Sequence, residues 1–67
     1  MMFYIISAKG IIRSYSSKAE AIKIALAINR KFGDFQRVVK IADRGKLIAY
    51  GLNPDDPDNW MDPDDYP

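Results

Sequence analysis

The last fifteen residues, Asn53 to Pro67, limit how much of this 67-residue chain can form regular structure. They contain four prolines, at positions 54, 57, 63 and 67. Proline lacks a backbone N–H and clashes with the preceding helical turn, so this spacing excludes a long helix or a central strand. We therefore predict a folded body over residues 1–52 and an acidic Pro/Asp-rich tail over residues 53–67.

The body and the tail carry opposite charges. Residues 1–52 hold all ten Lys and Arg residues against three acidic residues, a formal charge of +7. The tail holds six aspartates and no cation, a formal charge of −6, so the net value of +1 hides the separation. Charge divided this sharply along a chain indicates recognition, either between the two parts or with an outside surface.

Four runs of β-branched and aromatic residues predict strands, at 2–7, 11–16, 35–42 and 47–52. Lys9-Gly10 provides a hairpin turn between the first two runs, and "DRGK" provides one between the last two. Between the hairpins, residues 18–32 predict an amphipathic helix with apolar residues on one broad face. Ser17 and Glu20 form a capping box at its start, and Gly33 is suited to its C-terminal cap.

The expected fold is therefore α+β, a small antiparallel four-stranded sheet in the order β-β-α-β-β with one helix packed on one face. Alternation along the strands divides the side chains between the two faces of the sheet. The residues expected to face the helix are Phe3, Ile5, Ile12, Val39, Ile41, Leu47 and Ala49. The residues expected on the opposite face are Tyr4, Ile6, Arg13, Tyr15, Val38, Lys40, Ile48 and Tyr50.

The opposite face mixes tyrosines, cations and aliphatic side chains, whereas a solvated face should be more uniformly polar. We therefore expect something to cover it. A second copy of the chain is one candidate. The tail is another, with Trp60 on the aliphatic residues and its aspartates beside Arg13, Lys40 and Lys46. A ligand, either nucleic acid or protein, is the third.

The composition argues against catalysis and against metal binding. The chain has no cysteine and no histidine, so it lacks thiolate metal ligands, disulfides and the usual acid–base group near neutral pH. The three acids of the body, Glu20, Asp34 and Asp43, fall on a cap and two turns. The tail lacks the glycine and glutamate of a calcium-binding EF-hand loop. We expect no enzyme activity, no cofactor and no metal site.

The chain is also expected to be cytoplasmic and to make no membrane contact, because no apolar run has membrane-spanning length and "MMFYIISAKG" lacks a leader pattern. A core this small without disulfides or metals is marginal, which favours a homodimer or a stable partner.

The primary functional hypothesis is a non-enzymatic protein-binding regulatory module whose tail contacts a basic surface on a larger partner. Its expected partner-binding residues are Asp55, Asp56, Asp58, Trp60, Met61, Asp62, Asp64, Asp65 and Tyr66. The ending "DDYP" is similar to the acidic tails of bacterial single-stranded-DNA-binding proteins, which implies partner recruitment, although an aromatic final residue is missing. The overall format resembles small phage or mobile-element proteins that bind a host enzyme, which implies an inhibitor of a larger nucleic-acid-handling enzyme.

Two alternatives remain open from the sequence. The first is a nucleic-acid-binding module, since aromatic rings stack on bases and cations hold phosphates, with the tail as an intramolecular competitor. Its expected site residues are Tyr4, Arg13, Tyr15, Lys40, Lys46 and Tyr50. The second alternative is a structural homodimer subunit with neither kind of ligand.

Overall fold

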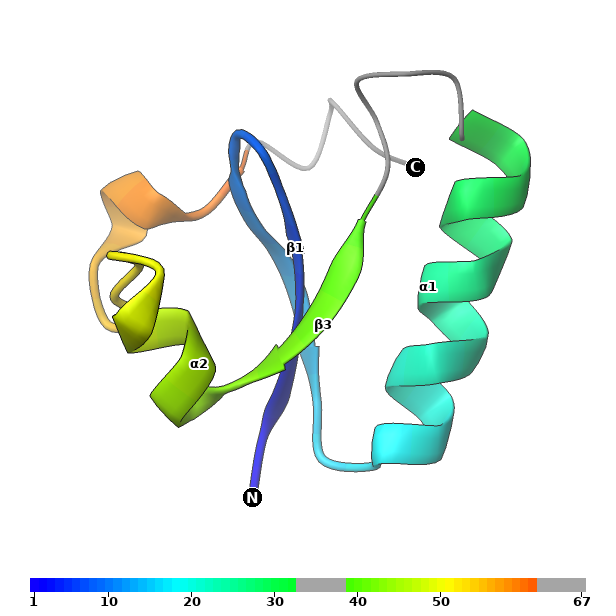
Figure 1. The fold of residues 1–67 in the computed structure, drawn as a ribbon, viewed down its shortest axis with the longest axis horizontal. Coiled ribbons are helices and arrows are strands. Elements are labelled where there is room, and N and C mark those ends of the chain that lie inside the picture. Colours follow the sequence, from blue (N-terminus) through cyan, green and yellow to red (C-terminus); the bar gives the residue numbers. More distant parts are fainter. Residues whose placement is uncertain (33–38, 62–67) are drawn as a thin grey trace.

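The computed structural model describes residues 1–32 and 39–61 of the chain. Within these residues the elements follow in the order β1 (Phe3–Ser7), β2 (Gly10–Tyr15), α1 (Lys18–Phe32), β3 (Lys40–Asp43), α2 (Arg44–Ala49) and the 3-10 turn η1 (Pro57–Asn59). The strands form an antiparallel sheet in the order β2-β1-β3. Figure 1 shows α1 on one side of this sheet and α2 with η1 on the other. The α+β class and the antiparallel sheet with a covering helix are confirmed.

The β1–β2 hairpin forms where the sequence predicts it, but its pairing contains an irregularity. Ile5 pairs with Arg13, the register then shifts, and Ile6 pairs with Ile11. Ile12 is therefore an extra residue in β2, as in a β-bulge, which reverses the alternation of the residues that follow. Tyr15 packs with the residues beneath α1, so its expected place on the opposite face is wrong.

Helix α1 has the predicted bounds and the predicted N-terminal cap. The backbone N–H of Glu20 donates to Ser17 Oγ at 3.3 Å. The helix contacts all three strands and carries the chain across β1, so that β2 and β3 run parallel at the two edges. Its apolar face is narrower than expected, because Ile22 and Leu26 are 41% and 57% exposed.

The chain re-enters the sheet at Val39, where a side chain from α1 holds it. The Asn29 amide donates to the Val39 carbonyl at 3.1 Å and accepts from the Val39 N–H at 2.8 Å. Both backbone groups of Val39 are thereby satisfied before β3 begins at Lys40. The expected strand at 35–42 is described only from residue 39 onward. Gly33, Asp34 and Val38, which the sequence assigns to a cap, a turn and a strand, lie outside the described residues.

The predicted fourth strand at 47–52 is wrong, because residues 44–49 form helix α2. Asp43 has an extended backbone and its carboxylate accepts from the Lys46 N–H at 2.8 Å, the geometry of a helix N-cap. The "DRGK" run is therefore the first turn of a helix rather than a hairpin turn. Leu47 is buried on the side opposite α1 and Ala49 is exposed, so neither lies on the expected face.

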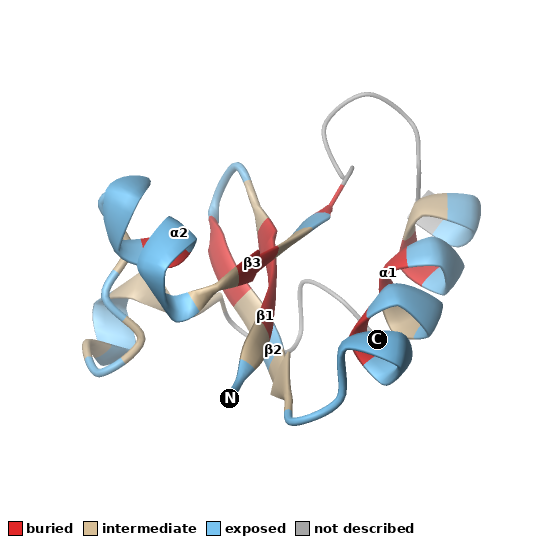
Figure 2. Cartoon of the chain, turned by 60° about the horizontal axis from the view of Figure 1, so that its bottom comes forward, coloured by how far each residue is buried: buried red, intermediate tan, exposed pale blue. Residues whose placement is uncertain are grey.

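The sheet is buried on both faces, and Figure 2 shows buried segments in the strands and in both α1 and α2. One cluster lies under α1 and consists of Ile5, Ala25, Ile28 and Val39. The other lies under α2 and consists of Tyr4, Ile6, Ile11, Ala42 and Leu47, with Leu52 and Trp60 packed against it. The central strand β1 thus contributes three consecutive buried residues, two to one cluster and one to the other. Among the described helices, none is long and apolar enough to cross a membrane.

Replacing Asp43 with alanine should destabilise the protein by about 1 kcal/mol, because the Lys46 N–H loses its side-chain acceptor at the start of α2. Urea unfolding measures the change. Asp43→Asn is the matched control, since asparagine caps helices about as well as aspartate. Equal stabilities of the alanine and asparagine variants would contradict the capping role.

Replacing Gly10 with alanine should destabilise the protein by about 2 kcal/mol or more. Gly10 has a φ of +140°, and a Cβ placed on it would lie 2.6 Å from the backbone oxygen of Asn59. Gly45→Ala is the contrasting variant. Its Cβ would meet only the Asp43 carboxylate at 3.4 Å inside α2, so a gain of about 0.5 kcal/mol is expected there. Thermal or urea unfolding of both variants tests the contrast. Changes in the free energy of unfolding that have the same sign in both variants would contradict it.

Candidate functional site

Trp60 attaches the described part of the tail to the body. Its ring packs edge-on against Tyr4, with ring centroids 6.2 Å apart and an interplanar angle of 71°. Its indole Nε1–H donates to the Pro54 carbonyl at 2.8 Å, so the polar atom of the ring is also satisfied. Aromatic pairs in this T-shaped arrangement are favourable beyond the area that they bury. The ring therefore serves the protein's own core rather than standing free for a partner.

The residues at Trp60 also meet the outer edge of β2. Ile11 and Trp60 form a parallel bridge, and the Met61 N–H donates to the Ile11 carbonyl at 2.7 Å. The Ser7 hydroxyl donates to Met61 Sδ at 2.9 Å. Of the three covers that the sequence allows for this face, the chain's own tail is the one seen among the described residues, and helix α2 shares that role.

Residues 53–59, here called the acidic loop, leave Leu52 and return to the sheet at Trp60. The loop is closed by its own hydrogen bonds. The Asn53 N–H donates to Asn59 Oδ1 at 2.9 Å, and the Asp55 N–H donates to Asn53 Oδ1 at 2.9 Å. Asp56 caps the η1 turn by accepting from the Asp58 N–H at 2.9 Å. The single helical turn of the loop is therefore η1, at Pro57–Asn59.

The carboxylates of the acidic loop lie at the surface. Asp55 and Asp58 are exposed, and Asp56 is partly exposed. Arg44 Nη2 donates to Asp55 Oδ2 at 2.8 Å, and both side chains remain largely in solvent. The hydrogen bond and charge of Asp55 raise the pKa of Arg44 above its ordinary value, so this guanidinium stays protonated. Arg44 was not among the cations expected to meet the aspartates of the tail, and it pairs here with Asp55.

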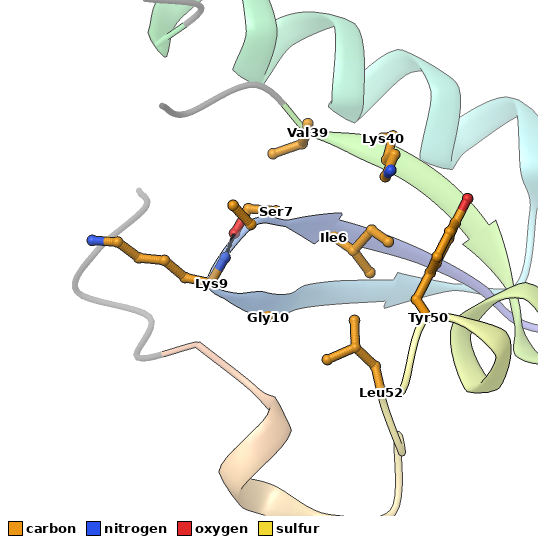
Figure 3. Close-up of a pocket in the computed structure, with 9 residues that line it drawn as sticks. Ile6, Ser7, Lys9, Gly10, Val39, Lys40, Tyr50 and Leu52 are labelled. Atoms are coloured by element: carbon orange, nitrogen blue, oxygen red, sulfur yellow. Dashed lines mark hydrogen bonds between the residues drawn. The ribbon is translucent and has the colours of Figure 1, made fainter. Parts of the chain in front are cut away.

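A pocket of about 480 Å³, here called the hairpin-tip pocket, lies at the end of the sheet next to the β1–β2 turn (Figure 3). It is lined by Ile6, Ser7, Ala8, Lys9, Gly10, Val39, Lys40, Tyr50 and Leu52. The Lys40 ammonium lies 4.6 Å from the centroid of the Tyr50 ring, a cation–π contact. The volume is within the range of ligand-binding pockets.

The residues expected to bind nucleic acid are not brought together on one open face. Tyr4 is only 6% exposed beneath Trp60, and Tyr15 packs on the α1 side. Tyr50 and Lys40 do lie side by side at the hairpin-tip pocket. The remaining two, Arg13 and Lys46, are exposed on β2 and α2.

The residues expected to bind a protein partner divide into three groups. Asp55, Asp56 and Asp58 lie together in the acidic loop. Trp60 and Met61 contact the body instead of solvent. The remaining four, Asp62, Asp64, Asp65 and Tyr66, lie outside the described residues.

Sequence reasoning missed both the role of Arg44 and the hairpin-tip pocket. The pocket draws its walls from the first hairpin, the start of β3 and the segment after α2, so no local pattern marks it. Within residues 1–32 and 39–61, no group of three or more carboxylates is placed to hold a metal ion. Comparison with protein-family models, curated proteins and solved structures returned no match to this chain.

Replacing Trp60 with alanine should destabilise the protein by about 2–3 kcal/mol, because a half-buried aromatic ring and its hydrogen bond to Pro54 are both removed. Trp60→Phe, which keeps a ring on Tyr4 but loses the Nε1 donor, should cost about 1 kcal/mol. Urea unfolding followed by circular dichroism measures both. A Trp60→Ala stability within about 0.5 kcal/mol of wild type would show that the ring is not part of the core.

Proposed function

We propose that the protein is a non-enzymatic protein-binding module whose acidic loop contacts a basic surface on a larger partner. The observation that carries this proposal is the attachment of the loop by Trp60. The ring lies on Tyr4, the indole bonds to Pro54, and the carboxylates of Asp55 and Asp58 are left facing solvent. The loop is thus ordered before any partner arrives, which lowers the entropic cost of association.

This proposal assigns Trp60 a different role from the one expected from sequence. An aromatic residue between aspartates suggests an anchor inserted into the partner, yet the indole is already packed and hydrogen-bonded within the chain. The recognition energy then comes from electrostatic complementarity at Asp55, Asp56 and Asp58. Such contacts raise the association rate and weaken as salt rises. If the partner's basic surface is a nucleic-acid groove, binding there makes the protein an inhibitor.

The nucleic-acid alternative is less well supported by the geometry. It requires Tyr4 and Tyr15 on an accessible face, whereas one is buried beneath Trp60 and the other lies on the α1 side. Base stacking needs exposed rings along a groove of cations. Tyr50 beside Lys40 offers one such ring, and this single pair is the feature that favours nucleic acid.

Affinity capture with the full chain as bait tests the proposal. The wild-type protein should retain a partner from a cell extract, and the Asp55→Asn/Asp58→Asn variant should lose most of it. Titration calorimetry with the purified partner should then show affinity lower by about 2- to 30-fold for the double variant, at about 0.2–1 kcal/mol for each exposed pair. Higher salt should reduce the difference.

Glu20→Gln is the matched control, because it removes one exposed carboxylate from α1, away from the acidic loop. Its partner affinity should equal that of wild type within about a factor of two. Three results would overturn the proposal: equal losses for the loop and control variants, preferential capture of nucleic acid, or a stable homodimer in sedimentation that retains no partner.

A further inference from the structure

The hairpin-tip pocket contains one large side chain, that of Tyr50, whose identity the fold does not explain. Tyr50 follows α2, and its backbone N–H caps the helix by donating to the carbonyls of Lys46 and Leu47 at 3.0 and 3.1 Å. That backbone role would be met by most residues. The residue as a whole is 54% exposed, and it lines the wall of the pocket. A large aromatic surface left in water beside a pocket is more typical of a binding site than of a core.

The chemistry of the pocket is an apolar floor with a cation at its side. Ile6, Val39 and Leu52 provide aliphatic surface, and Ile6 and Val39 are nearly fully buried beneath it. Its two charged lining residues, Lys9 and Lys40, are both cations. In Figure 3 the Lys9 side chain extends away from the pocket, whereas the Lys40 ammonium lies toward the Tyr50 ring.

We propose that the hairpin-tip pocket is a docking site for an acidic peptide segment of a partner protein. An aliphatic or aromatic side chain of that segment packs on Ile6 and Leu52 against the Tyr50 ring, and an adjacent carboxylate pairs with the ammonium of Lys40. The charge of the pocket selects the anion and its floor selects the apolar side chain. This site is separate from the acidic loop, and the proposal does not depend on the function assigned to that loop.

A peptide fits these features better than a nucleic acid does. A nucleic-acid strand is held by a series of cations along its phosphates, and its bases stack on aromatic faces. Here one ammonium lies beside the ring, the second lysine, Lys9, extends away from the pocket, and the remaining walls are aliphatic or small. Aliphatic floors with a single charged contact are suited to a side chain flanked by a carboxylate.

Three synthetic peptides test the apolar contact and the carboxylate contact separately. The first is acetyl-Asp-Asp-Leu-Asp-Asp-amide, the second replaces its leucine with glycine, and the third replaces its aspartates with asparagine. In two-dimensional amide NMR of the full-length protein, the first peptide should shift the amide resonances of Ile6, Lys40, Tyr50 and Leu52. The second should bind at least about fivefold more weakly and the third about threefold more weakly, since each lacks one of the two contacts.

Variants of the protein complete the test. Lys40→Gln should weaken the first peptide about threefold and Tyr50→Ala about tenfold, whereas Tyr50→Phe should retain binding within about twofold. Lys46→Gln, an exposed lysine of α2 outside the pocket, is the matched control and should have no effect. The Asp55→Asn/Asp58→Asn variant should also bind normally, which separates this site from the acidic loop. Trp60 fluorescence reports whether each variant keeps the core intact.

The proposal is overturned if the leucine and glycine peptides bind equally, because the apolar floor would then have no part. Equal effects of Lys40→Gln and Lys46→Gln would also overturn it, because the peptide would then respond only to the net charge of the protein. An oligothymidine that shifts the same amides at lower concentration than the first peptide would assign the pocket to nucleic acid instead.

Discussion

The contact between Trp60 and Tyr4 is the one on which the second face of the sheet depends. The sheet has three short strands in the described chain, and β1 at its centre must be covered on both sides. Helix α1 covers one face, where Met61 also packs against the buried cluster. Helix α2 has only six residues and cannot cover the other face by itself. The indole completes that layer with Leu52. The acidic loop is therefore joined to the cationic body by an aromatic contact, while its Asp55 and Asp58 side chains remain exposed.

The elements that the sequence predicted well are those with local signals. Helix α1 was correct because Ser17 and Glu20 define its start and its apolar period is sustained over 15 residues. The first hairpin was correct because Gly10 permits the tight connection. Helix α2 was missed because its Leu, Ile and Tyr residues favour a strand locally, whereas the Asp43 cap and the burial of Leu47 favour a helix. The bulge at Ile12 depends on pairing with β1 and leaves no local pattern.

The candidate sites were predictable to different degrees. Spaced aspartates are visible in the sequence, so an acidic segment could be predicted, but the sequence left open whether this segment is extended or turned. The inward direction of Trp60 was one of the alternatives that the sequence left open, because it depends on the space that α2 leaves above Tyr4 and Ile11. The hairpin-tip pocket is the least predictable from the sequence. Its residues Ile6, Lys40 and Tyr50 meet only after the crossover through α1 has placed β3 beside β1. A site assembled by topology is not encoded in any single stretch.

The closure of the sheet edge by Met61 has a consequence for how the molecule folds. Met61 bonds to Ile11 and Ser7, and the Ser7 contact joins residues 54 positions apart. The entropy of closing so long a loop is recovered only after the hairpin, α1 and β3 are in place, so these contacts form late. Interactions absent from the folding transition state govern how fast the native state opens. We therefore expect the contacts of Met61 to slow the unfolding of the protein more than they speed its folding.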